Sequence, residues 1–418
     1  MKGLQKIKAS ALQFVMLVSV IIAILLASFL TLTHTHWFFG KQSEFLLESV
    51  EVSNDGIIYS LDPNNRLMDS VELKNEAFIT QINKEGWGGF LKIESRTTYQ
   101  SKPFTKIGLT GSMPDKVPTA LWMGEKQLPL VLVGDTEIVG DAYVSDRGLK
   151  AGIIAGHYYN GPELLQGEIK LSSGDLPKLD SQWLQQTESI IKNFPFEEYI
   201  LVGVAKENEN SFLNATQLIY EKESLTLSET YIGNIIIKSD TEIIVAPFAN
   251  LKDVVLIAPK VTIQKGFTGT THLLATKQIK LEENVTMQYP SSVILLENKQ
   301  EFENNVLEGE EPIILSQESE LFGNILYICE SVSQNRVNIS IDIQNKARVT
   351  GHIYCEGNTQ LSGVVEGTVF TERFIYSGFG SRYINHIYDG KVLANKLPKE
   401  FCGLPLENKK KGVGLWLY

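Results

Sequence analysis

The hydrophobic pattern divides the chain into one long apolar segment near its start and a longer region of short, alternating runs. Residues 11–32 contain no charged residue and are rich in Leu, Ile and Val. A helix over this segment is about 33 Å long, close to the ~30 Å hydrocarbon core of a bilayer. The sequence therefore predicts a transmembrane helix over residues 11–32, followed by an amphipathic helical continuation over residues 33–60.

The residues that flank the apolar segment predict its orientation. Residues 1–10 form a basic leader with Lys2, Lys6 and Lys8 and no acidic residue. Such a leader keeps the N-terminus in the cytoplasm. The residues after Leu32 contain no small-x-small cleavage site, which favours an uncleaved anchor over a cleaved signal peptide. We therefore expect a single-pass protein of the inner (cytoplasmic) membrane, with residues 11–32 in the lipid bilayer and a periplasmic or extracellular body.

The rest of the chain has the texture of β-strands. Polar and apolar residues alternate over much of it, and β-branched residues recur between isolated glycines. The predicted parts are a β-rich membrane-proximal domain (70–125), a glycine-rich β segment (126–172), a helix (180–194), two repeat blocks (200–297 and 321–395), an acidic loop (298–320) and a C-terminal tail (396–418). The helix is predicted from a stripe at 3.6-residue spacing that includes Trp183, Thr187 and Ile190.

The strongest periodicity is a repeat of short apolar strands. The triplets 243–245, 261–263 and 279–281 recur at a spacing of 18, and 254–256 and 273–275 at a spacing of 19. In the second block, 349–353 and 361–365 share an apolar-x-Gly-x-apolar pattern at a spacing of 12, and Gly351, Gly357 and Gly363 are six residues apart. Short strands that recur every ~18 residues predict a β-solenoid. A β-sandwich with coincidental spacing is the alternative.

Two further segments are defined by charge. The acidic one is rich in glutamate: Glu297, Glu301, Glu303, Glu308, Glu310, Glu311, Glu318 and Glu320. We interpret it as an exposed loop, with a cation site as the alternative. The C-terminal tail has three consecutive lysines and then an apolar end, so it either caps an edge strand or serves as a docking peptide.

Composition argues against several functions. A net charge of −11 and an isoelectric point near 5.2 disfavour nucleic acid as a partner. Three cysteines exclude a disulfide scaffold and a four-cysteine zinc site. The chain contains no nucleophile elbow, phosphate-binding loop, dinucleotide glycine fingerprint or HExxH motif. We therefore expect no enzyme activity, and no catalytic residue, cofactor or metal site.

A few individual residues are candidates for chemistry. His157 is the best candidate for a general base, although no orienting acid is evident beside it. His34 and His36 are either interfacial polar residues or a weak metal pair, and His352 reads as structural. Cys329 and Cys355 occur in similar contexts at a spacing of 26, so they form either a disulfide between coils or buried core positions. Cys402 is then unpaired or pairs with one of them.

The N-terminus resembles that of type IV pilin-like and pseudopilin proteins. It has a basic leader, a small-residue junction at Ala9-Ser10-Ala11, a long apolar helix and a continuation that includes residues 43–60. It departs from that pattern at Phe14, near which the family carries a glutamate. A plain signal anchor is the alternative.

The repeat region resembles bactofilin-type polymer-forming domains. Together, the two resemblances imply a structural or assembly protein, such as a minor pilin-like component of a surface or secretion apparatus, with protein partners or self-association. The alternative function is a β-helix enzyme or binding module that acts on envelope or extracellular polysaccharide.

Overall fold

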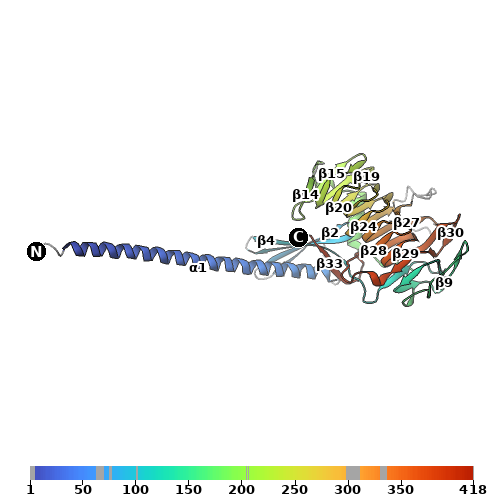
Figure 1. Ribbon diagram of the computed structural model, residues 1–418, viewed down its shortest axis with the longest axis horizontal. Coiled ribbons are helices and arrows are strands. Elements are labelled where there is room, and N and C mark those ends of the chain that lie inside the picture. The colour runs from blue at the N-terminus through green and yellow to red at the C-terminus, as the bar shows by residue number, and fades with distance from the viewer. Residues whose placement is uncertain are drawn as a thin grey trace.

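The structure, a computed structural model, describes residues 5–62, 70–74, 78–99, 102–203, 205, 207–297, 311–329 and 337–417. One long helix projects from a β-rich body, and the N-terminus lies at the end of the helix farthest from that body (Figure 1). This confirms the predicted fold class, which is mainly β with one long apolar N-terminal helix.

Helix α1 (Gln5–Leu61) is continuous, so no break separates the predicted membrane segment from its continuation. Its last turns pack on an antiparallel sheet with the strand order β1-β2-β3-β4-β33. The strands are β1 (Ser70–Lys74), β2 (Ile79–Trp87), β3 (Phe90–Tyr99), β4 (Lys102–Ser112) and β33 (Lys411–Trp416). Because β33 pairs with β4, the C-terminal tail caps the edge of β4, which is one of its two predicted roles.

The second part of the body is a stack of mostly short parallel strands, built from two separate stretches of the chain. The first stretch contains β5 (Thr119–Met123), β6 (Leu130–Val133), β7 (Glu137–Val139), β8 (Asp141–Val144), β9 (Leu149–Ala151), β10 (Ile153–Ile154), β11 (His157–Tyr158) and β12 (Ile169–Leu171). Helix α2 (Ser181–Lys192) follows it, with Asp180 as its N-cap, within the predicted range 180–194.

The second stretch begins after the 3-10 helix η1 (Phe196–Glu198). It contains β13 (Ile200–Leu201), β14 (Glu207–Asn210), β15 (Gln217–Glu221), β16 (Leu225–Leu227), β17 (Thr230–Gly233), β18 (Ile235–Ser239), β19 (Glu242–Val245), β20 (Asn250–Ile257), β21 (Lys260–Ile263), β22 (Thr268–Ala275), β23 (Gln278–Leu281) and β24 (Thr286–Glu297). It continues with β25 (Ile313–Leu315), β26 (Glu320–Cys329), β27 (Ile339–Ile343), β28 (Arg348–Leu361), β29 (Val364–Gly378), β30 (Ser381–Ile384), β31 (His386–Tyr388), β32 (Lys391–Leu393) and the 3-10 helix η2 (Ala394–Lys396).

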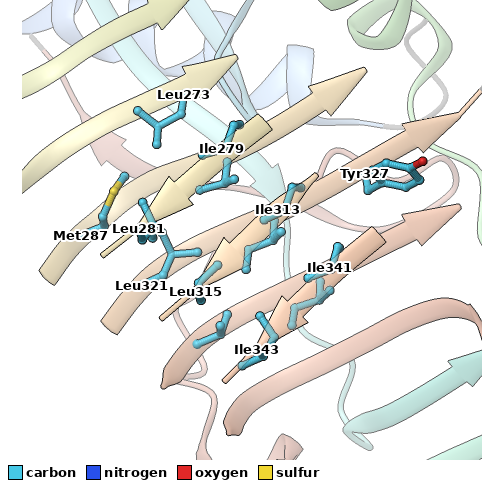
Figure 2. Close-up of a cluster of buried hydrophobic side chains, with 14 of the residues drawn as sticks. Leu273, Ile279, Leu281, Met287, Ile313, Leu315, Leu321, Tyr327, Ile341 and Ile343 are labelled. Carbon is cyan, nitrogen blue, oxygen red and sulfur yellow. The ribbon is translucent and has the colours of Figure 1, made fainter. Parts of the chain in front are cut away.

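The 18-residue repeat is visible directly in the strand pairing. Ile243 lies opposite Val261, and Val261 lies opposite Ile279. Apolar side chains from successive coils point to the same interior and form rows there (Figure 2). Each fully buried aliphatic side chain contributes about 1.5–3 kcal/mol relative to an exposed one. The periodic apolar positions of the sequence are therefore the core of the stack.

One predicted register is wrong. Leu256 lies opposite Leu273, so the offset between the two strands is 17 rather than the 19 that their triplets indicated. The pairing shifts between Lys252 and Val254, where Asp253 has a φ of 60°. This irregularity changes the offset, which a pattern of apolar letters does not reveal.

The predicted glycine repeat is also wrong. Val349 lies opposite Val365, at a spacing of 16, and the glycines that lie in register are Gly323, Gly351 and Gly367. Each has a φ between 148° and 158°. A Cβ atom on any of them would collide with a main-chain carbonyl oxygen of the coil beside it. These glycines are therefore required by close backbone approach between coils.

Part of the range predicted as an acidic loop belongs to the core. Strand β25 lies within 298–320, and all three of its residues are buried. It pairs with β23 and β27, because its apolar triplet continues the inward row of the neighbouring coils. Residues 298–310, which carry four of the glutamates, lie outside the described residues.

The two stretches of the stack form one continuous structure. Near the end of the second stretch, β29 pairs in parallel with β5 of the first, with Val369 opposite Leu121. Along one face the strand order is β12-β8-β5-β29-β28-β26-β24-β22-β20-β18-β15-β13. Since β12 and β13 are at opposite ends of this order, the segment that contains α2 runs from one end of the stack to the other.

Candidate functional site

The exposed part of helix α1 is the first candidate surface. Every side chain from residue 11 to residue 44 is exposed, including Trp37, Phe38 and Phe39. By length and composition, α1 contains a segment that is able to cross a membrane. At 1.5 Å per residue, residues 11–44 extend over about 50 Å, whereas a bilayer core is ~30 Å thick. A bilayer core therefore covers only part of this apolar helix.

A row of small residues attaches the other end of α1 to the antiparallel sheet. Ser49, Ser53, Gly56 and Ser60 are buried or nearly so, and Ser53 donates a hydrogen bond from Oγ to the carbonyl oxygen of Ser95 at 2.8 Å. A Cβ atom at Gly56 would meet Ser95 and Thr80. Close backbone approach therefore holds the helix against the sheet, and Ile57 packs with Ile82 and Ile93 beside it.

An apolar cleft lies where α1 leaves the sheet. Its volume is about 590 Å³, and its lining includes Trp37, Phe45, Tyr99 and Phe104. The rings of Phe45 and Tyr99 stack with their centroids 4.3 Å apart. Aromatic side chains of this kind are typical of the boundary between a membrane and water.

The turn between β2 and β3 attaches the antiparallel sheet to the outer face of the parallel stack. Trp87 donates from Nε1 to the carbonyl oxygen of Asp253 at 3.1 Å, and the main-chain N–H of Gly89 donates to Ser292 Oγ at 2.8 Å. Trp183 of α2 donates from Nε1 to the carbonyl oxygen of Gly88 at 3.1 Å. Helix α2, the antiparallel sheet and the parallel stack are therefore held together by specific buried contacts.

The side chains on the stack that contact Gly88 and Gly89 belong to a longer row of polar residues. His272, Ser292, Asn324 and His352 lie opposite one another on successive strands, and all are buried. His272 Nδ1 lies 2.9 Å from Ser292 Oγ. Burial lowers the pKa of His272 to about 3 and that of His352 to about 4. Both imidazoles are therefore neutral packing groups at neutral pH.

The histidines singled out in the sequence do not come together. His34 and His36 are exposed on α1, and His157 is exposed on β11, where its ring stacks on Phe379 with the centroids 5.6 Å apart. Within the described part of the chain, no group of three or more His, Cys, Asp or Glu residues is able to hold a metal ion.

None of the three cysteines forms a disulfide in the described structure. Cys355 lies opposite Tyr327, and Cys329 lies opposite Glu297, so the two cysteines do not occupy matching positions on neighbouring coils. Burial raises the pKa of Cys355 to about 12 and that of Cys402 to about 11. Neither thiol has the lowered pKa of a reactive nucleophile.

Two groups of attachment residues were not predicted from the sequence. The small residues of α1 recur at positions 49, 53, 56 and 60, and this alternation of four and three residues was a detectable signal of one helix face. The β2–β3 turn, Trp87-Gly88-Gly89-Phe90, carried only a generic turn signal. Its partners on the stack lie far away in the chain, at Asp253, Ser292 and Asn324.

No protein-family model and no curated protein matches this chain. Among solved structures, the competence-associated pilin ComZ from Thermus thermophilus is aligned over 83% of this chain and 87% of its own length. The sequence identity is 10% and the TM-score is 0.26, so this likeness by itself carries no argument about function.

Proposed function

We propose that this protein is a membrane-anchored, pilin-like structural component of a surface assembly. In this proposal, α1 lies with its N-terminal end in the cytoplasmic membrane and packs with the helices of other subunits. The antiparallel sheet fixes the helix to the body, and the parallel stack is displayed outside the membrane.

The exposed apolar surface of α1 beyond a single bilayer thickness carries this proposal. If residues 11–32 cross the membrane, the next turns leave Trp37, Phe39 and Leu47 uncovered, with exposed fractions of 62%, 61% and 71%. Exposed apolar surface of this extent marks an interaction site. Helices that pack side by side would cover it, both within the membrane and beyond it.

The ends of the parallel stack offer a second assembly surface. The outermost strand at one end exposes Ile169 and Leu171, and the outermost strand at the other end exposes Ile200 and Leu201. Open strand edges with exposed apolar side chains pair readily with another chain. This favours a scaffold role over enzyme action on polysaccharide, and the proposal includes no catalytic role for His157.

Photo-crosslinking in cells tests the helix-packing role. A benzophenone amino acid in place of Phe39 or Leu47 is expected to form crosslinks to protein, either to a second copy or to another helical membrane protein. The matched control is Phe248, which is 76% exposed on the parallel stack and is expected to give far fewer crosslinks. Adducts with lipid alone at both helix positions would contradict the proposal.

The mass of the N-terminal peptide of protein purified from membranes distinguishes the two kinds of anchor. A chain that starts at Ser10 or Ala11 has been processed by a leader peptidase, as the pilin-like role requires. An intact Met1 would leave a simple anchored stack.

A further inference from the structure

A cluster of aromatic side chains lies at the surface where four segments of the stack meet. It consists of His157 on β11, Tyr376 on β29, Phe379 in the β29–β30 turn, Tyr383 on β30, and His386 and Tyr388 on β31. We refer to these six residues as the tip aromatic cluster. None of them is buried, and Phe379 is 55% exposed.

The rings of the cluster contact one another at stacking distances. Tyr376 and Tyr388 stack with their centroids 4.8 Å apart, and His157 stacks on Phe379 at 5.6 Å. Tyr388 also meets His157 edge-on at 5.8 Å, and Tyr383 lies 6.3 Å from Tyr376. These contacts therefore join the rings into one aromatic cluster.

The backbone at Phe379 is unfavourable for a bulky side chain. Strands β29 and β30 pair up to Gly378 and Ser381, so Phe379 and Gly380 form a two-residue turn, with φ values of 52° and 73°. Positive φ at both positions is typical of the type I′ turn, which strongly prefers Asn-Gly. An exposed phenylalanine is costly there and gains little burial. Strain of this kind is found where a side chain serves binding.

The charges around the cluster exclude polyanions. Asp389 follows Tyr388 directly, and its Oδ1 accepts a hydrogen bond from the main-chain N–H of Asp135 at 2.8 Å. The pKa of Tyr388 is raised first by burial and then by the charges of Asp389 and Asp135. Both carboxylates therefore lie close to its ring. Arg382 lies beside Tyr383 on β30 and so points to the opposite face of the hairpin. Nucleic acid would require basic residues around the rings.

Neutral sugars fit this surface. The C–H faces of a pyranose ring stack on aromatic rings, and its hydroxyls bond to carboxylates, amides and phenols. Asn160 donates from Nδ2 to Asp135 Oδ1 at 3.2 Å, which places an amide beside the carboxylates. We propose that the tip aromatic cluster, with Asp135, Asn160 and Asp389 at its edge, binds a neutral polysaccharide chain.

The location of the cluster agrees with such a role. Strand β30 lies on the side of the body away from helix α1 and its N-terminus (Figure 1). In a protein anchored by α1, the cluster would face outward from the membrane. This orientation rests on the proposed function. The proposal that the cluster binds sugar does not, because it is argued from the ring contacts and charges alone.

Calorimetric titration of the full chain in detergent micelles tests the proposal. The probes are chitohexaose, cellohexaose and maltohexaose, with a 20-nucleotide single-stranded DNA as the polyanion. At least one oligosaccharide is expected to bind, and Phe379→Asn is expected to weaken binding about tenfold or more. Because Asn-Gly suits the turn, this variant should melt at the same or a higher temperature, which separates lost binding from lost folding.

Phe248→Asn is the matched control, since it makes the same change at another exposed phenylalanine. It should leave oligosaccharide binding unchanged. The proposal is overturned if no oligosaccharide binds at millimolar concentration, or if Phe379→Asn binds as well as the parent. It is also overturned if the DNA binds and Phe379→Asn abolishes that binding. The same holds if analytical ultracentrifugation shows a dimer that Phe379→Asn dissociates, because the cluster would then be an interface between copies of the chain. None of these results bears on crosslinking by α1, so the two proposals fail separately.

Discussion

Two buried histidines on the stack make the stability of the fold sensitive to acid. His272 and His352 have pKa values of about 3 and 4, below the ordinary 6.5, because burial disfavours their charged forms. Below about pH 6.5 the unfolded chain binds protons that the folded chain does not. The free energy of unfolding is therefore expected to fall as pH drops from about 6.5 towards 4, by up to about 1.4 kcal/mol per pH unit for each histidine.

Denaturant unfolding at several pH values checks this expectation. His272→Asn should reduce the slope of unfolding free energy against pH over this range, whatever it does to stability at neutral pH. Phe248→Asn, which changes an exposed residue that does not titrate, should keep the slope of the parent. Equal slopes for the parent and His272→Asn would show that His272 is not kept neutral by the fold.

At the scale of an element, α1 has two glycines in different surroundings. Gly56 faces Ser95 and Thr80 of the sheet, whereas at Gly40 a Cβ atom would meet nothing within 4 Å. Gly56→Leu is therefore expected to lower the free energy of unfolding by about 1–3 kcal/mol through overpacking. Gly40→Leu should be neutral or stabilising by up to about 1 kcal/mol, because leucine favours helix.

Thermal unfolding of both variants in detergent gives the comparison. Equal melting temperatures would mean that the end of α1 is not held tightly against the sheet. A selective loss in Gly56→Leu would support a rigid connection between the anchoring helix and the body.

Elements with local periodicity were the part of the fold that the sequence predicted. The apolar run of α1, the stripe around Trp183 and the 18-residue strand repeat all depend on neighbouring residues. The strand register near Asp253 could not be predicted from the sequence. A single residue with a positive φ changes that register without changing the apolar pattern. The contacts of Gly88 and of the rings around Phe379 join segments that are far apart in the chain, so no local pattern in the sequence reveals them.

At the scale of the whole molecule, the pairing of β29 with β5 joins the two stretches of the stack, which are far apart in the chain. Leu121 is fully buried at this pairing. In a stack, each coil is stabilised mainly by its neighbours. Leu121→Ala, which costs about 2–5 kcal/mol, should therefore loosen the coil beyond it more than the centre of the stack.

Hydrogen exchange read by mass spectrometry shows where protection is lost. After Leu121→Ala, exchange should speed up most in β8 and β12, and least in β20 and β22. Leu273→Ala is the comparison, because it removes the same side chain from the middle of the stack and should affect coils on both sides. If Leu121→Ala instead lowers the protection of amide hydrogens evenly throughout, the antiparallel sheet, α2 and the stack unfold as one unit. The body would then resist local opening at either end.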